Sequence, residues 1–203
     1  MVSRIFALLA LACLALAGCG DFGKIEQGRV VAFDKDKKTV TFLPNSALSG
    51  TPKYAAPPLV FAIPEDPAEM GRDPKGGMLR TNINIEKKLI SMYNPQAKAI
   101  EDLSFELVEN HTGVNVRRQH PLVYDAAARK PRVFPQVDAA KKTVTAYSAR
   151  QQMLTVMKFS DADFAKYNGD QWGAGDEIRI YYKQPGKALR LMNITQTDIT
   201  RRR

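Results

Sequence analysis

The sequence predicts a mainly β protein, and three observations lead to this prediction. Of the 203 residues, 44% are hydrophobic and 25% are charged, a composition typical of folded domains rather than disordered chains. Short apolar runs rich in Val, Thr and aromatic residues alternate with turn-forming segments. After Cys19, no long stretch shows apolar residues at helical spacing.

In the first half of the chain, β-forming runs predict strands at residues 28–34, 38–43, 58–62, 79–92 and 98–108. Glu86-Lys87-Lys88 favours a break within the fourth of these strands. A helical turn is expected at Pro64–Met70, and loops rich in Pro, Ser and Gly are expected at 44–57 and 73–77. Residues 109–130, which contain both histidines, are expected to form a linker.

The second half predicts strands at residues 131–137, 141–148, 152–159, 176–183 and 187–196. Ser160 is suited to cap a short helix after the third strand, because its hydroxyl can accept a backbone N–H. Three strands, a short helix and two strands follow the element order of an OB-fold, a small five-stranded barrel.

The first half fits the same order with insertions. The sequence therefore predicts two tandem small OB-like β-barrel domains, at 25–108 and 131–198, followed by a basic tail at 199–203. SH3-like barrels and one continuous β-sandwich remain open as alternatives.

An internal repeat supports the division into two related halves. The segment Asp34–Thr41 (DKDKKTVT) recurs as Asp138–Thr145 (DAAKKTVT), and Tyr93–Ile100 is echoed by Tyr182–Leu189 in the same order. Either an ancestral domain was duplicated, or both segments are hairpins of a common type.

The first 19 residues form a separate unit. Arg4 precedes an apolar stretch at Ile5–Leu16, which is long enough for a signal peptide and too short to span a bilayer. The tetrapeptide Leu16-Ala17-Gly18-Cys19 follows. These residues resemble the N-terminus of a bacterial lipoprotein precursor, in which such a tetrapeptide is the lipobox.

The resemblance implies that residues 1–18 are removed as a signal peptide and that diacylglycerol is attached to the Cys19 thiol. An N-acyl chain such as palmitate would follow on the new amine, and two or three chains anchor a protein durably. Residues 19–24 would then tether a periplasm-facing protein to the cell envelope. Gly20 after the cysteine favours the outer membrane as the destination of such a lipoprotein, and Asp21 leaves the inner membrane as an alternative destination. A plain cleaved signal peptide with an incidental Cys19 is the alternative.

The chain is basic, with 30 Lys and Arg against 21 Asp and Glu and a formal net charge of +9. Such a charge favours anionic partners such as phospholipid headgroups or anionic glycans. Nucleic acid is not an expected partner outside the cytoplasm.

Lysines cluster in the loops that would border the ligand face of each OB-like unit, where they could bind an anionic ligand. These candidates are Lys37, Lys38, Lys98, Lys141, Lys142, Lys183 and Lys187. Trp172 could add a platform for a sugar ring. Exposed hairpin loops also favour lysine for solubility, and a tryptophan at such a position can equally belong to the core.

The sequence contains no standard enzyme signature, and removal of Cys13 with the signal leaves no thiol besides the lipid-bearing Cys19. His111 and His120 lack a metal-ligand spacing. A copper site built from Trp172 and the thioethers Met153, Met157 and Met192 is a minor alternative. Paired carboxylates are a further minor candidate, at Glu65/Asp66, Glu101/Asp102 and Asp161/Asp163.

We therefore expect a membrane-anchored, non-catalytic binding or scaffold module of the cell envelope, with no cofactor besides its lipid and with an unidentified envelope protein as partner. A binder of anionic glycan or lipid headgroups is the alternative function. An enzyme or metal carrier is less favoured.

Overall fold

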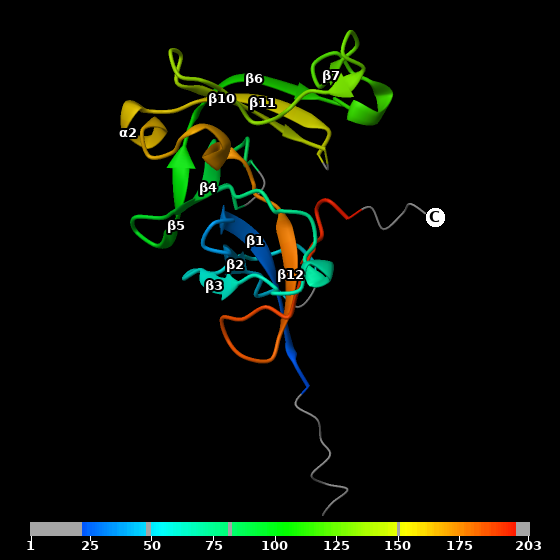
Figure 1. Ribbon diagram of the computed structural model, residues 1–203. Helices are drawn as coiled ribbons and strands as arrows, with labels where there is room; N and C mark the ends of the chain where they lie inside the picture. The colour runs from blue at the N-terminus through cyan, green and yellow to red at the C-terminus, as the bar shows by residue number, and fades with distance from the viewer. Residues whose placement is uncertain (1–21, 48–49, 81–82, 150, 198–203) are drawn as a thin grey trace, which may run out of the picture.

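The fold consists of a five-stranded sheet, a four-stranded sheet and two separate hairpins (Figure 1). The computed structural model describes residues 22–47, 50–80, 83–149 and 151–197. The predicted signal peptide, Cys19 and the basic tail lie outside these residues. Among the described residues, no helix is long and apolar enough to cross a bilayer. The prediction of a mainly β protein is confirmed.

The five-stranded sheet has the order β13-β12-β1-β2-β3, and all its neighbouring strands are antiparallel. Its strands are β1 (Lys24–Asp34), β2 (Thr39–Pro44), β3 (Leu59–Ala62), β12 (Glu177–Tyr182) and β13 (Arg190–Asn193). An isolated parallel bridge joins Ala62 at the end of β3 to Lys187, just before β13. The 3-10 helix η1 (Pro67–Glu69) follows β3, within the predicted helical turn.

The four-stranded sheet has the order β6-β11-β10-β9, made of β6 (Glu106–Thr112), β11 (Met153–Lys158), β10 (Thr143–Ser148) and β9 (Gln136–Asp138). The two hairpins are β4 (Leu89–Asn94) with β5 (Ala99–Ser104), and β7 (Tyr124–Asp125) with β8 (Lys130–Pro131). Besides η1, the described residues form three further short helices: η2 (Val116–Arg118), α2 (Asp161–Phe164) and η3 (Gly169–Trp172). As predicted, the Ser160 hydroxyl caps α2 by accepting the backbone N–H of Asp163.

Tandem OB-like barrels are not confirmed, because none of the sheets closes and both main sheets combine strands from the two predicted halves. The five-stranded sheet joins β1–β3 to β12 and β13, and the four-stranded sheet joins β6 to β9–β11. The predicted linker at 109–130 contains the end of β6 as well as β7, so it is not a plain connection. Alternating apolar residues identify strands, but they do not identify which strand lies next to which.

Within the predicted strand 79–92, the break at Glu86-Lys87-Lys88 is confirmed: these residues turn the chain before β4 begins at Leu89. The predicted strand 187–196 is regular only over β13.

One type of turn recurs along the chain. Its first residue is Asp, Asn or Ser, and that side chain accepts a backbone N–H two or three residues later. Its fifth residue adopts a left-handed backbone conformation with positive φ, and this residue always has a long polar side chain. These fifth residues are Lys38, Lys88, Lys98, Gln119, Arg129, Lys142 and Gln152.

The repeat found in the sequence therefore lies in the turns and not in whole domains. Asp34–Thr41 and Asp138–Thr145 both form this turn, yet the first connects the central strands of one sheet and the second connects an edge strand of the other. The two segments share a local conformation without a shared strand order.

Three hydrophobic cores hold the elements together, and β1 and β2 contribute to two of them. Val30 and Phe42 are buried on the inner face of the five-stranded sheet, in a core that also includes Leu191 of β13 and has Met70, just after η1, packed against it. Their neighbours Val31 and Leu43 face the opposite side, where they pack with the inner face of the four-stranded sheet, the β4–β5 hairpin and Trp172. A third core covers the outer face of β11 with residues from 114–134.

Three backbone segments meet beside a bulge at Val31 in β1: β1 itself at Val30, the segment at Gly77, and the segment 173–175. Glycines allow this close approach. The Gly77 N–H donates to the Val30 carbonyl, and a Cβ at Gly77 would lie 2.3 Å from the Gly173 carbonyl oxygen. Gly175 has a φ of +68°, and a Cβ there would lie 2.2 Å from the Val30 oxygen. No side chain fits between these segments.

We expect Gly77→Ala to lower the free energy of unfolding by about 2–3 kcal/mol, because the new methyl group would collide with rigid backbone. Chemical denaturation would measure the loss. Gly113→Ala is the matched control: nothing lies within 4 Å of its Cβ position, so only the positive φ of +72° is penalised, by about 1 kcal/mol. Equal losses at the two positions would contradict the proposed collision.

The recurring turns predict a dependence of stability on acidic pH. A turn N–H lowers the pKa of Asp34, Asp125 and Asp138 below the ordinary value of 3.8. Because the folded-state pKa is lowered, these carboxylates stabilise the fold above about pH 4 and lose that effect as the pH falls further. Replacing all three with Asn keeps an acceptor oxygen but removes the titration.

Urea unfolding between about pH 6 and pH 2 would test this. We expect the free energy of unfolding to fall less steeply for the triple Asn variant than for the wild type. Asp36→Asn is the control, since this exposed carboxylate accepts no hydrogen bond from the described residues. A triple variant with the wild-type slope would refute the prediction.

Candidate functional site

The outer face of β1, β12 and β13 carries an unusual set of side chains. Strand alternation turns Ile178, Ile180 and Leu191 inward, where they are buried. The opposite face of the same strands would ordinarily be polar, but it presents Tyr181 and Met192.

These side chains line a shallow hollow of about 590 Å³, together with Ile25 at the start of β1 and Leu189 just before β13. Ile25 is 63% exposed, Leu189 46% and Met192 40%. A contiguous exposed apolar patch of this kind is typical of a surface that binds a partner or a membrane. We refer to Ile25, Tyr181, Leu189 and Met192 as the apolar patch.

The apolar patch lies where the chain enters the fold. Ile25 pairs with Tyr181 across β1 and β12, and the Tyr181 ring lies directly against Gly23. Phe22, the first described residue, is almost fully exposed. In Figure 1, the start of β1 and the loop between β12 and β13 lie at the lower end of the molecule, away from the four-stranded sheet.

Basic side chains surround the apolar patch. Arg179 donates to the Gln27 side chain at 3.0 Å, and Arg190 forms a two-point contact with Glu69 that lowers the pKa of this carboxyl. Lys24, Lys183 and Lys187 are exposed on neighbouring segments. This end of the molecule therefore combines apolar contact area with a rim of positive charge.

The seven predicted loop lysines do not form one site. Three of them pair with nearby carboxylates: Lys37 with Asp34, Lys141 with Asp138, and Lys142 with Asp161. Lys98 occupies the turn between β4 and β5, on a different part of the molecule.

The loops of Lys38 and Lys187 do come together. The Ile63 N–H donates to the Lys38 carbonyl, and the Ala62 N–H donates to the Gly186 carbonyl. The segment that follows β3 therefore contacts both loops, which places Lys37 and Lys38 in the same region as Lys183 and Lys187.

Trp172 does not offer a platform for a sugar, because it is only 2% exposed. Its indole lies against Phe159, Phe164 and Tyr167, with ring centroids 4.6–5.7 Å apart. Met153 and Met157 are buried in the same core, whereas Met192 belongs to the apolar patch. The copper site considered from the sequence is therefore not assembled, and the described residues contain no group of three or more His, Cys, Asp or Glu side chains that could hold a metal ion.

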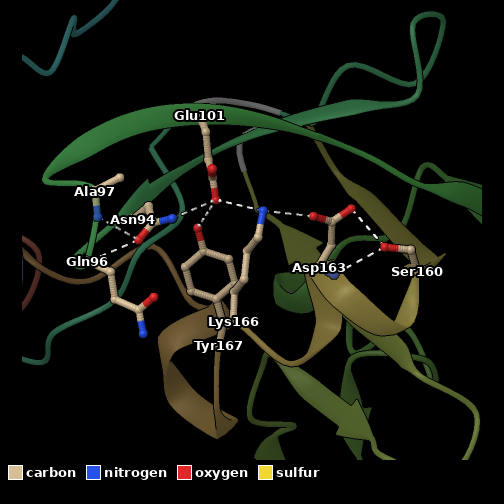
Figure 2. Close-up of polar contacts among 8 residues, drawn as sticks. All are labelled: Asn94, Gln96, Ala97, Glu101, Ser160, Asp163, Lys166 and Tyr167. Carbon is tan, nitrogen blue, oxygen red and sulfur yellow. Dashed lines mark hydrogen bonds and ion pairs between the residues drawn. The ribbon is translucent and has the colours of Figure 1, made fainter.

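A polar network lies between the β4–β5 hairpin and the segment around α2 (Figure 2). Glu101 on β5 accepts from the Tyr167 hydroxyl at 3.0 Å, and from Lys166 and Asn94 at 3.3 Å each. Lys166 also pairs with Asp163 at 2.9 Å. Burial and the hydrogen bond to Glu101 raise the pKa of the Tyr167 hydroxyl, so it remains a donor at neutral pH.

This network connects the β4–β5 hairpin to the segment around α2. One Glu101 oxygen accepts from three donors, and Asp102 beside it accepts from Ser91 at 2.5 Å. A general base or acid needs a carboxyl group that can reach a substrate proton. We therefore interpret the network as a clamp that holds α2 on the hairpin.

Both histidines contact residues of their own segments. His111 lies on β6 and pairs with Glu109 at 3.1 Å, while the His120 ring accepts the Leu122 N–H.

The apolar patch was missed by the sequence analysis. Ile25, Leu189 and Met192 are scattered along the chain, and each fits equally well as an inward-facing strand residue. Only the pairing of β1 with β12 and β13 brings them together.

A family described as a domain of unknown function (DUF4881) matches residues 21–202. The chain belongs to this family. The DUF4881 match spans both predicted halves without interruption and begins after the predicted signal peptide and Cys19. No curated protein and no solved structure matches this DUF4881 chain.

The clamp predicts a measurable loss of stability when its buried hydroxyl is removed. Tyr167→Phe should lower the free energy of unfolding by about 1–2 kcal/mol, because Glu101 loses a hydrogen bond from a buried donor. Tyr181→Phe is the matched control, since the Tyr181 hydroxyl has no hydrogen-bond partner among the described residues. Thermal unfolding that separates the two variants would support the clamp, and equal effects would contradict it.

Proposed function

We propose that this DUF4881 protein is a lipid-anchored, non-catalytic binding module of the bacterial cell envelope, and that its apolar patch lies on the membrane surface. The observation that carries the proposal is the position of the patch. Exposed apolar side chains with a basic rim stand beside the point where the chain from Cys19 enters β1.

The short tether supports this orientation. Four residues separate Cys19 from Lys24, and an extended chain covers about 3.4 Å per residue. An acylated Cys19 would thus hold the start of β1 within roughly 20 Å of the bilayer. A patch at this end of the molecule would face the headgroups, whereas the four-stranded sheet would point away from them.

The charge of the patch supports a lipid partner. Apolar side chains that enter the interfacial region contribute by burial, and each nearby Lys or Arg adds about 1 kcal/mol of attraction to an anionic membrane. Lys24, Lys183 and Lys187 could approach lipid phosphates while Ile25 and Leu189 enter the interface.

A non-catalytic role is supported by the use of the polar side chains. The carboxylates of Glu101, Asp163 and Asp176 each accept from more than one donor, as expected of structural groups. The unidentified envelope protein would bind elsewhere on the exposed part of the module.

We further propose that the five-stranded sheet forms a single OB-like unit. Its strand order matches that of a five-stranded OB-fold in which the edges meet in parallel, and the Ala62–Lys187 bridge supports such a meeting. In this arrangement the residues between β3 and β12 are one long insertion. The loops of Lys38 and Lys187 would then border the ligand face.

Cys19→Ser in the full precursor tests the anchor. We expect wild-type protein to incorporate an alkyne-labelled palmitate and to fractionate with membranes, and the variant to do neither. A Cys19→Ser protein that is processed normally and still fractionates with membranes would contradict lipid attachment at this position.

Leu189→Glu tests the patch separately from the anchor. In the mature chain carrying Cys19→Ser, binding to phosphatidylglycerol vesicles should fall about tenfold, because a leucine side chain contributes roughly 1.5–3 kcal/mol when buried. Val133→Glu is the control at an exposed apolar residue outside the patch. Vesicle sedimentation at low and high salt would measure binding, and equal binding by both variants would argue against membrane contact.

A further inference from the structure

A second site lies between the two main sheets and does not depend on the proposed membrane role. A cavity of about 630 Å³ opens between Arg29 on β1 and the end of β10, and Tyr54, Leu79, Arg80 and Ile83 also line it. Its size is within the range of small-molecule sites, which are mostly apolar with a few fixed polar groups.

Arg80 is the unusual member of this lining. It is only 2% exposed, which is rare for arginine. Its Nε donates to the Met78 carbonyl at 2.9 Å, and one terminal nitrogen reaches the Arg29 carbonyl at 3.4 Å. The other terminal nitrogen, Nη2, is buried and has no hydrogen-bond partner among the described residues. Leaving a buried charged donor unpaired is costly.

The second guanidinium lies close by. Arg29 stacks on the Tyr54 ring, with its central carbon 5.0 Å from the ring centroid. Its Nε lies 3.6 Å from Glu177, too far for a hydrogen bond, and is likewise buried without a partner among the described residues.

Glu177 is the carboxylate nearest to this pair, and its oxygens are already used. It accepts from the Tyr54 hydroxyl at 2.6 Å and from the Gln27 amide at 3.2 Å. One carboxylate thus faces two guanidinium groups, which leaves an excess of one positive charge. Burial and the charge of Arg29 lower the pKa of Arg80, yet a guanidinium is basic enough to stay protonated at neutral pH.

From this arrangement we infer that the cavity binds an organic carboxylate with a small apolar body. The carboxylate pairs with the Arg80 and Arg29 guanidinium groups and balances the excess charge. The apolar body contacts Leu79, Ile83 and Ala146 along the wall. Since Nη2 is enclosed, the ligand displaces part of the lining around Tyr54 as it enters.

A carboxylate fits the cavity better than a phosphate dianion because it carries a single negative charge, which matches the one excess positive charge. A dianion would overcompensate the excess of one positive charge in a partly dry site, and that cost disfavours it. Apolar lining residues likewise disfavour a bare inorganic ion.

Hexanoate is a suitable probe, with hexanamide as its neutral counterpart of the same size. In the mature chain carrying Cys19→Ser, we expect hexanoate to bind at least tenfold more tightly than hexanamide or inorganic phosphate, measured by titration of backbone amide NMR signals. Arg80→Met, which keeps the side-chain volume but removes the charge, should weaken hexanoate binding at least tenfold. Arg118→Met, at an exposed arginine on η2 outside both the cavity and the apolar patch, should leave it unchanged.

Thermal unfolding adds a measurement that does not rely on binding signals. Without ligand, Arg80→Met should be as stable as the wild type or more stable, because it removes an uncompensated buried charge. Hexanoate should raise the melting temperature of the wild type and not that of Arg80→Met. If Arg80→Met fails to fold, Arg29→Gln should show the same loss of binding.

Equal affinity for hexanoate and hexanamide would overturn the proposal, as would tighter binding of phosphate or no binding of hexanoate. Undiminished hexanoate binding by Arg80→Met or Arg29→Gln would also overturn it. A bound water that satisfies Nη2, with no effect of any carboxylate, would show that the site is structural. None of these results bears on lipid attachment at Cys19 or on vesicle binding by the apolar patch.

Discussion

The rest of the structure depends on how β1 crosses the molecule. Its neighbouring residues Val30 and Val31 face opposite sides and belong to different cores, so one strand holds both main sheets in place. Neighbouring segments can approach β1 closely because they carry glycine at the points of contact. Gly77 and Gly175 bring their backbones against Val30, and the hydrogen bond between Gly77 and Val30 joins the insertion to the strand. Both candidate sites are built from this strand: Ile25 belongs to the apolar patch, and Arg29 lines the cavity.

Strand positions could be predicted from the sequence far better than strand partners. Most expected β-runs correspond to a strand within a few residues, because alternating apolar residues and turn-forming segments act locally. The exceptions are 79–92, where β4 begins only at Leu89, 98–108, which divides into β5 and β6, and 131–137, where β9 begins only at Gln136. The pairing of β1 with β12 depends on residues about 150 positions apart, and no local pattern encodes it. The internal repeat was misleading for the same reason. Asp138 and Lys142 suit one turn type, which needs an acceptor at its first position and a left-handed residue at its fifth, and this turn explains their recurrence without a shared strand order.

The side chains of the candidate sites also depend on the folded arrangement, so the sequence alone does not identify them. Loop lysines stand out in the sequence, but Lys37, Lys141 and Lys142 pair with carboxylates in the folded chain. Arg80 gives no signal at all, since a single arginine between Leu79 and Thr81 looks like an ordinary surface residue. Only its burial distinguishes it. Net charge therefore leads to an expectation of anionic partners, but it cannot show which cations are left without a counter-charge.

The position of β1 in the centre of its sheet also bears on how the protein is made. Both of its neighbours are needed for a complete sheet, and one of them, β12, lies near the other end of the chain. A chain emerging from the ribosome or from a secretion channel cannot finish this sheet until its last thirty or so residues are available. A fold with such distant contacts forms slowly. The same delay leaves the half-built sheet edge of β1 open to chaperones or to wrong partners until β12 and β13 arrive.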